Sequence, residues 1–72
     1  MIQSIDHAGR YCTLTHKGQP VQLGEILEDF RGDQSRVTGG QAPHKPSSTG
    51  KIFTTAGNYY PGVFDCQWTP NQ

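Results

Sequence analysis

The sequence predicts a mainly β fold, a small five-stranded antiparallel bent sheet or open barrel with one long polar loop. Three observations predict this class. Nine glycines and five prolines divide the 72 residues into short runs. Several of these runs are rich in β-branched and aromatic residues, which favour strands over helices. The last run alternates apolar and polar side chains with a period of two, which is typical of a half-buried strand.

Five segments are predicted to be strands: residues 11–15, 20–23, 35–38, 51–55 and 63–68. They form a single domain over residues 10–68. Residues 1–9 have few apolar side chains and are expected to be loose or to add an edge strand. Residues 69–72 are expected to form a frayed tail.

The segment after the first hairpin has two interpretations. The spacing of Ile26, Leu27 and Phe30 fits one helical turn. It also fits a strand that ends at a turn through Arg31-Gly32-Asp33. We favour the strand, because the pattern L-G-E-I-L-x-x-F-x-G-x-x-x-x-V is typical of the strand, tight loop and strand run of small SH3-like barrels.

The apolar side chains supply a small core. They make up 32% of the chain, whereas globular domains usually reach roughly 45–50% when glycine is counted. Phe64, Cys66 and Trp68 share one face of the last predicted strand. Cys12 lies on another strand, so its pairing with Cys66 stays open, although reduced cysteines are the simplest expectation for a cytosolic chain. The predicted core comprises Cys12, Leu14, Val21, Leu23, Ile26, Phe30, Val37, Phe53, Phe64, Cys66 and Trp68.

Charge and hydropathy argue against several classes of protein. Six basic and six acidic side chains give a formal net charge of zero, so the global positive charge of many nucleic-acid binders is missing. No apolar run approaches the roughly 20 residues of a membrane span. The first residues also lack the pattern of a signal peptide. We therefore expect a cytoplasmic protein with no membrane partner.

The titratable residues do not form a recognisable catalytic or metal-binding pattern. The histidines and cysteines lack the close ligand pairs of zinc sites. The six carboxylates are scattered, and so short a chain has little interior in which to exclude water and shift pKa values. We expect a protein that is not an enzyme and that uses no metal and no cofactor.

The longest polar stretch is APHKPSSTGK, residues 42–51. Its end resembles a phosphate-binding loop, but that motif needs glycine where Lys45 stands and serine or threonine where Ile52 stands. Long loops in small domains are often functional, and Pro43 and Pro46 stiffen this one by fixing φ. The stretch is either a binding loop or a solvated connection between strands.

The candidate partner-binding residues combine the cations and hydroxyl groups of this loop with two arginines and one tyrosine. They are Arg31, Arg36, His44, Lys45, Ser47, Ser48, Thr49, Lys51 and Tyr59. Tyr59 and Tyr60 are adjacent, so on a strand they point to opposite faces and at least one is expected to be exposed.

Three segments resemble a known family. Phe30 to Ile52 reads F-R-G-D-x-x-x-V-T-G-G-x-A-P-H-K-P-S-S-T-G-K-I, Cys12 to Gly24 reads C-T-L-T-H-K-G-Q-P-V-Q-L-G, and Tyr60 to Phe64 reads Y-P-G-V-F. Over residues 13–68 the chain resembles a family of small bacteriophage and prophage proteins with no assigned chemistry. The resemblance implies a phage origin and a site of action in the host bacterial cytoplasm.

Phage genomes contain many small proteins that bind and redirect a host machine. By this analogy, the first hypothesis is a non-enzymatic protein-binding module that modulates a host complex, most concretely the bacterial transcription machinery with its RNA polymerase. The alternative is a small nucleic-acid-binding barrel, and a minor virion structural component is a further one. Salt dependence separates the first two, because phosphate contacts weaken steeply as salt rises.

Overall fold

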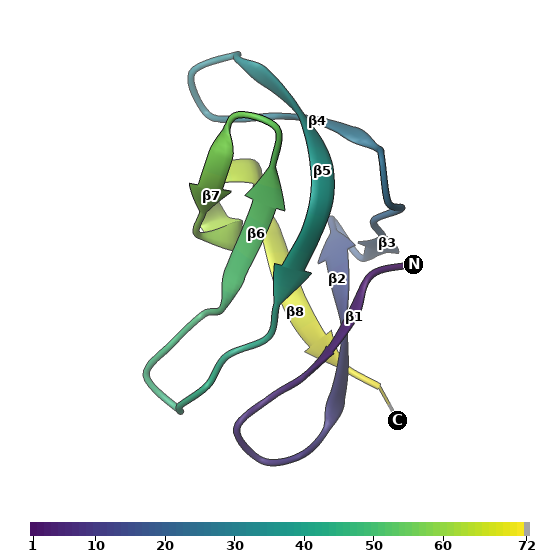
Figure 1. The fold of residues 1–72 in the computed structure, drawn as a ribbon, viewed down its shortest axis with the longest axis vertical. Helices are drawn as coiled ribbons and strands as arrows, with labels where there is room; N and C mark the ends of the chain where they lie inside the picture. Colours follow the sequence, from purple (N-terminus) through teal and green to yellow (C-terminus); the bar gives the residue numbers. More distant parts are fainter. Residues whose placement is uncertain (72) are drawn as a thin grey trace.

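The computed structural model describes residues 1–71, which form eight short strands and one 3-10 turn (Figure 1). In chain order the elements are β1 (Gln3–Ile5), β2 (Tyr11–His16), β3 (Gln19–Pro20), β4 (Ile26–Glu28), β5 (Gln34–Gln41), β6 (Lys51–Thr54), β7 (Gly57–Tyr59), η1 (Pro61–Phe64) and β8 (Cys66–Pro70). The predicted mainly β class is confirmed. Within residues 1–71 the strands form two antiparallel sheets that do not close into a barrel.

The first sheet is built around β2. Strand β8 pairs with one edge of β2 along residues 12–16. Strands β1 and β3 pair with β2 residues that β8 also covers, so they lie end to end along its other edge. Lys17 and Gly18 form the turn between β2 and β3 with positive φ values of 51° and 82°, as a two-residue hairpin turn requires.

The second sheet has the order β4-β5-β6-β7. Its longest strand, β5, shifts register once where it pairs with β6, and such a bulge bends a strand. The two sheets meet where β1 runs beside the end of β5. There the Ala42 N–H donates to Ser4 Oγ (2.9 Å), and the His7 N–H donates to the Pro43 carbonyl (2.8 Å).

The core lies between the two sheets. Leu14, Val37, Ile52 and Phe64 are fully buried, and they come from β2, β5, β6 and η1 respectively. Because each sheet supplies part of one small core, neither sheet can bury its apolar face without the other.

All five predicted strands have different bounds in the structure: those at 11–15, 35–38 and 51–55 are Tyr11–His16, Gln34–Gln41 and Lys51–Thr54. The other two differ for reasons that the backbone shows. The strand predicted at 20–23 is only Gln19–Pro20, because the chain turns before Gly24 (φ 86°). The strand predicted at 63–68 begins at Cys66, because Pro61–Phe64 forms η1 and Asp65 takes a left-handed φ of 58°. A proline at the first position of η1 favours this turn, since its φ is fixed near −65° and it needs no N–H partner.

Both ends of the described chain are attached to β2. Residues 3–5 form the edge strand β1, which the sequence left as the alternative to a loose segment, and Ile2 is buried. Strand β8 continues through Pro70, and the Asn71 N–H donates to the Tyr11 carbonyl (2.8 Å). The last residue of the predicted frayed tail, Gln72, lies outside the described residues.

Three side chains predicted in the core are exposed. Leu23, Ile26 and Phe30 are 69%, 52% and 77% exposed, so these assignments are wrong. Leu23 and Phe30 lie in the turns on either side of β4, and the register of β4 explains Ile26, because Leu27 is its buried residue. Successive residues of a strand face opposite sides, so burying Leu27 leaves Ile26 outside.

Phe53 was also predicted in the core and is only half-buried, whereas its neighbour Ile52 is fully buried. Phe53 pairs with Gly39 across the β5–β6 ladder, and a Cβ on Gly39 would lie 3.6 Å from the Phe53 ring. The ring therefore covers a glycine backbone on the outer face of the sheet.

Cys12 and Cys66 are both buried and free. They lie on paired strands, but Cys12 is opposite Pro70 and Cys66 is opposite His16. The two cysteines are thus four ladder positions apart, or roughly 13 Å at 3.3 Å per residue. A disulfide needs Cα atoms within about 7 Å, so this register prevents the pairing.

Candidate partner-binding surface

Trp68 supports the base of the β5–β6 loop, residues 42–50. Its indole ring lies against Gly40 at the end of β5 and against Gly50 at the end of the loop. A Cβ built on Gly40 would lie 2.6 Å from the ring, and one on Gly50 would lie 2.7 Å from it. The indole N–H also donates to the Lys51 carbonyl (3.2 Å). The loop is therefore closed by a contact that only glycine permits.

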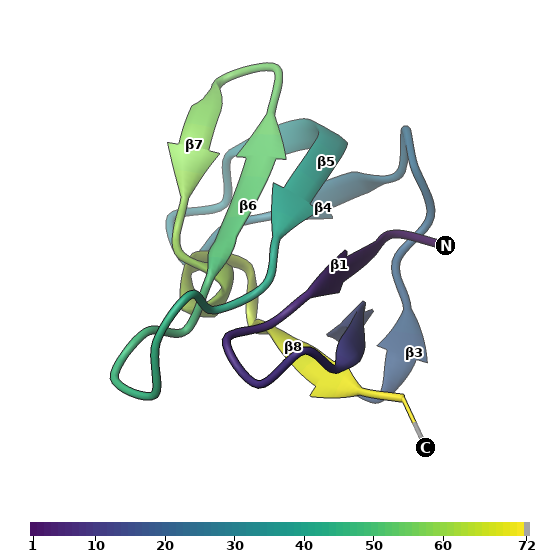
Figure 2. The same cartoon turned by 60° about the horizontal axis from the view of Figure 1, so that its bottom comes forward.

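The interior of the loop is held by one serine. Ser48 Oγ accepts a hydrogen bond from the Gly50 N–H (3.1 Å), and the Ser48 N–H donates to the Lys45 carbonyl (3.0 Å). Residues 44–47 are exposed, and the loop extends away from the body of the molecule (Figures 1 and 2). The base of the loop is thus fixed, and its tip is displayed to solvent.

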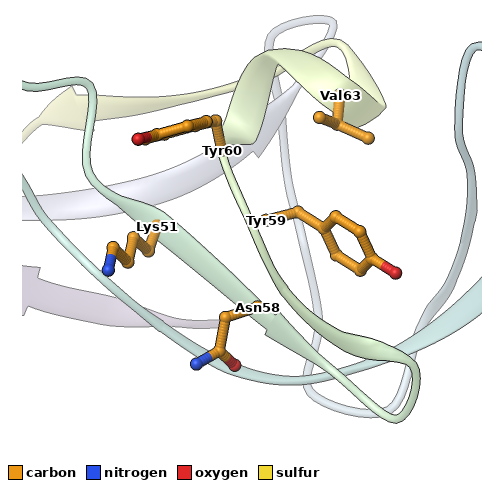
Figure 3. Close-up of a pocket in the computed structure, with 5 residues that line it drawn as sticks. All are labelled: Lys51, Asn58, Tyr59, Tyr60 and Val63. Atoms are coloured by element: carbon orange, nitrogen blue, oxygen red, sulfur yellow. The ribbon is translucent and has the colours of Figure 1, made fainter.

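Two hollows adjoin this loop and share Tyr60. One, of about 490 Å³, lies between the loop and Tyr60; the other, of about 350 Å³, lies beside strand β7 (Figure 3). We call their combined lining the loop face. It consists of Lys45, Ser47, Ser48, Thr49, Lys51, Asn58, Tyr59, Tyr60 and Val63.

The two tyrosines of the loop face differ in their contacts and exposure. The Tyr59 ring packs edge-on against Phe64 with centroids 5.6 Å apart, and its hydroxyl donates to the Ala56 carbonyl (3.3 Å). The Tyr60 side chain is 66% exposed. In Figure 3, Tyr59 and Val63 lie on one side of the strand, and Tyr60 and Lys51 lie on the other. Tyr60 is therefore the ring that can contact a partner freely.

The loop face is cationic although the net charge of the chain is zero. Two lysines line it, and none of its nine residues is acidic. Three carboxylates, those of Glu28, Asp29 and Asp65, instead line a third hollow of about 470 Å³ between β4 and η1, where the basic side chains are those of His16 and Lys17. The separation of charge gives the molecule a face suited to an acidic partner, a property that the overall composition does not reveal.

The structure brings six of the nine candidate residues together on the loop face: Lys45, Ser47, Ser48, Thr49, Lys51 and Tyr59. The other three lie elsewhere. Arg31 is in the β4–β5 turn with its guanidinium carbon 5.5 Å from the centroid of the Phe30 ring, and the Arg36 Nη1 donates to the Gly24 carbonyl (2.9 Å). His44 is exposed in the loop but lines neither hollow.

Three residues of the loop face were absent from the candidate set. Asn58, Tyr60 and Val63 join it because β7 and η1 fold back beside Lys51. The adjacency of Tyr59 and Tyr60 was the available signal, since it required one exposed ring. Asn58 had no signal in the sequence, because β7 was not predicted, and Val63 was predicted to lie in a strand, whereas it belongs to η1.

Asp6 is a buried carboxylate that organises the β1–β2 loop. Its Oδ1 accepts the N–H groups of Ala8 (2.9 Å) and Arg10 (3.0 Å), and its Oδ2 pairs with Arg10 Nη2 (2.8 Å). The Arg10 backbone N–H, with the Arg10 guanidinium and the Ala8 N–H, lowers the pKa of Asp6 to about 2 against the opposing effect of burial. Asp6 was not among the candidate residues, although an aspartate before a glycine-containing turn is a usable signal.

The buried thiols also have shifted pKa values. Burial raises the pKa of Cys66 to about 11, assisted by the carboxylates of Asp65 and Glu25. Burial and the neighbouring Asp6 carboxylate raise the pKa of Cys12, whose Sγ lies 3.6 Å from Asp6 Oδ2. All three shifted groups lie outside the loop face.

Within residues 1–71, no group of three or more histidine, cysteine, aspartate or glutamate side chains is placed to hold a metal ion. The same residues include no helix with the length and apolar character needed to cross a membrane. No family model, curated protein or solved structure matches the chain.

Proposed function

We propose that the protein is a non-enzymatic, phage-type binding module that acts in the host bacterial cytoplasm. Its partner is a host protein complex, most concretely the transcription machinery and its RNA polymerase. The observation that carries the proposal is the loop face, in which a loop with a fixed base stands beside an exposed tyrosine and two lysines.

The composition of the loop face supports a contact surface. Its exposed Tyr60 belongs to a residue type that is enriched at protein interfaces. Its lysines and hydroxyl groups add polar contacts that a partner can pair with.

A single-stranded nucleic acid is the second candidate partner, because Tyr60 offers an exposed ring close to Lys51 and Lys45. Proteins that bind single strands combine several cations with several stacking rings. The loop face has two lysines and one freely exposed ring, and Arg31 and Arg36 lie elsewhere. These features favour a protein partner.

The test is capture of purified bacterial RNA polymerase, and of complexes from nuclease-treated bacterial lysate, on the immobilised protein. The decisive variant replaces Lys45, Ser47, Thr49 and Lys51 by alanine and keeps Ser48, which holds the loop. The matched control is Lys17→Asn, which removes an exposed cation outside the loop face and tolerates the positive φ at that position.

We expect the native chain and Lys17→Asn to retain RNA polymerase and the four-alanine variant to lose it. Capture that disappears after nuclease treatment, or that falls steeply with salt, would favour the nucleic-acid candidate. Equal capture by all three proteins would place the contact outside the loop face.

A further inference from the structure

Strand β7 is the terminal strand of the second sheet. It lies at the margin of the molecule in both overall views, with η1 below it and no ribbon along its far side (Figures 1 and 2). A terminal strand leaves half of its backbone donors and acceptors without a ladder partner, which makes it a template for another strand. The hollow of about 350 Å³ is lined by two consecutive residues of this edge, Asn58 and Tyr59, and by Tyr60, which follows the strand.

The side chains around β7 divide into a cationic and an apolar set. Ile52 pairs with Tyr59, so Lys51 lies across from Tyr60 on the outer face of the sheet. On the opposite side, Tyr59 points with Val63 toward Phe64 (Figure 3). A strand added beside β7 would present alternate side chains to these two sides.

We propose that the β7 edge binds an extended segment of the partner protein in which acidic and apolar residues alternate. The segment adds as a strand to the second sheet, its carboxylates reach Lys51 and then Lys45, and its apolar side chains cover Tyr59 and Val63. This inference rests on the proposed function, because it specifies how a protein partner occupies the loop face. Backbone pairing supplies affinity in this mode, and the alternating side chains supply specificity.

Charge complementarity favours an acidic segment as the partner of the β7 edge. The lining of the loop face contains two lysines and no carboxylate, so an acidic segment meets no like charge there. A basic segment would meet Lys45 and Lys51, and an entirely apolar one would leave both ammonium groups beside an uncharged partner. A nucleic acid also carries the required charge, but it lacks the amide groups that pair with a strand edge.

The experiment is a titration of the isotope-labelled full chain, followed by amide NMR, with three synthetic nine-residue peptides. The first alternates glutamate and valine, the second alternates lysine and valine, and the third is the first peptide with alternate backbone nitrogens methylated. We expect the glutamate peptide to shift the amides of residues 51 and 58–60, and to show contacts between its backbone and β7. The lysine peptide and the methylated peptide should leave these signals in place.

Two protein variants complete the test. Lys51→Gln should weaken binding of the glutamate peptide about two- to fivefold, the range of an exposed ion pair. Lys17→Asn should bind it as the native chain does. Because Lys51 is exposed on the end of β6, its replacement leaves the core intact, and unchanged amide spectra of the free variant would verify this.

Equal binding of the methylated and unmethylated peptides would overturn strand addition. Equal binding to the native chain and Lys51→Gln would overturn the charge pairing. If a twelve-nucleotide thymidine strand shifts these amides and the glutamate peptide does not, the occupant is a nucleic acid and the inference is wrong. These results are independent of RNA polymerase capture, so the proposed function can fail while the β7 edge still binds the peptide.

Discussion

The β1–β2 and β5–β6 loops lie beside each other and are ordered by different contacts. In the first, residues 6–10, one buried carboxylate gathers two backbone N–H groups and a guanidinium, so the loop itself is internally bonded. In the second, residues 42–50, the Trp68 ring from β8 packs against Gly40 and Gly50 at the base of the loop. Near its end, the Gly50 N–H donates to Ser48 Oγ. The first loop is part of the fold, whereas the second is a displayed segment on a rigid support.

The contrast between these loops shows how a chain with a small core can carry an exposed loop. Ordering a polar loop costs conformational entropy that its own side chains do not offset. Trp68 restricts the two ends of the loop instead, and it does so with the same ring that fills the core of the fold. The position of the exposed loop and the stability of the core therefore both depend on the Trp68 side chain.

The largest expected effect is that of Trp68→Ala. Truncation of a buried tryptophan costs about 3–5 kcal/mol, which is a large part of the stability of a domain this small. We expect the variant to be mostly unfolded at 25 °C in a urea or thermal titration followed by circular dichroism. A melting temperature equal to that of the native chain would show that the ring does not support the core.

Gly50→Ala tests the clamp at the base of the loop alone. The added Cβ would lie 2.5 Å from the Gln41 carbonyl oxygen and 2.7 Å from the Trp68 ring, at a φ of 83°. Because a left-handed residue with a side chain already costs roughly 1–2 kcal/mol, we expect a loss of about 2 kcal/mol or more in the free energy of unfolding. Gly32→Ala is the matched control, since Gly32 has a similar left-handed φ of 88° and its Cβ would meet no atom within 4 Å. Equal stability of the two variants would contradict the clamp.

The contribution of Asp6 to the stability of the fold should depend on pH. The pKa of Asp6 falls from an ordinary value of 3.8 to about 2 on folding, so the folded state is favoured by ionisation of this group. This contribution is fully present above pH 3.8 and is lost as pH falls from about 4 to about 2. Melting temperatures measured from pH 5 to pH 2 should fall more steeply for the native chain than for Asp6→Asn, which cannot titrate. Parallel curves would show that Asp6 does not couple to folding.

The smallest effect on stability is expected in the displayed loop. Lys45, Ser47 and Thr49 are exposed, and such surface changes usually alter stability by less than about 0.5 kcal/mol each. The four-alanine variant should therefore melt close to the native chain while it loses its partner. Ser48→Ala is the sharper comparison, because it removes the hydrogen bond to the Gly50 N–H and should lower the melting temperature more than Ser47→Ala. The opposite order would show that the loop is ordered by other contacts.

The alternation of apolar and polar residues predicted burial correctly where the two faces of a segment differ in polarity. The alternation at Phe64, Cys66 and Trp68 predicted three buried side chains, and all three are buried, even though Phe64 belongs to a 3-10 turn. The pattern failed at Ile26 and Leu27, where two adjacent aliphatic residues compete for one inward position. Pairing with β5 decides between them, and that pairing is a long-range property absent from the local sequence.

The candidate site was predictable to the extent that it is contiguous in sequence. The loop lysines and hydroxyls were named from their composition, and six candidates lie on one face. Tyr60 was not in the candidate set because its exposure depends on the packing of Tyr59 against Phe64. Arg31 and Arg36 were named for their charge alone, and the fold places them elsewhere: Arg31 lies over Phe30 in the β4–β5 turn, and Arg36 bonds to the Gly24 carbonyl.

The two buried thiols allow opening of the β2–β8 ladder to be measured in the native chain. Cys12 and Cys66 sit at opposite ends of the β2–β8 ladder. Their raised pKa values leave little thiolate at neutral pH, and their burial blocks an alkylating reagent until the ladder opens. The alkylation rate of each cysteine therefore records how often its end of the ladder separates. Equal rates would mean that the whole chain opens as one unit, and unequal rates would identify the end that frays first.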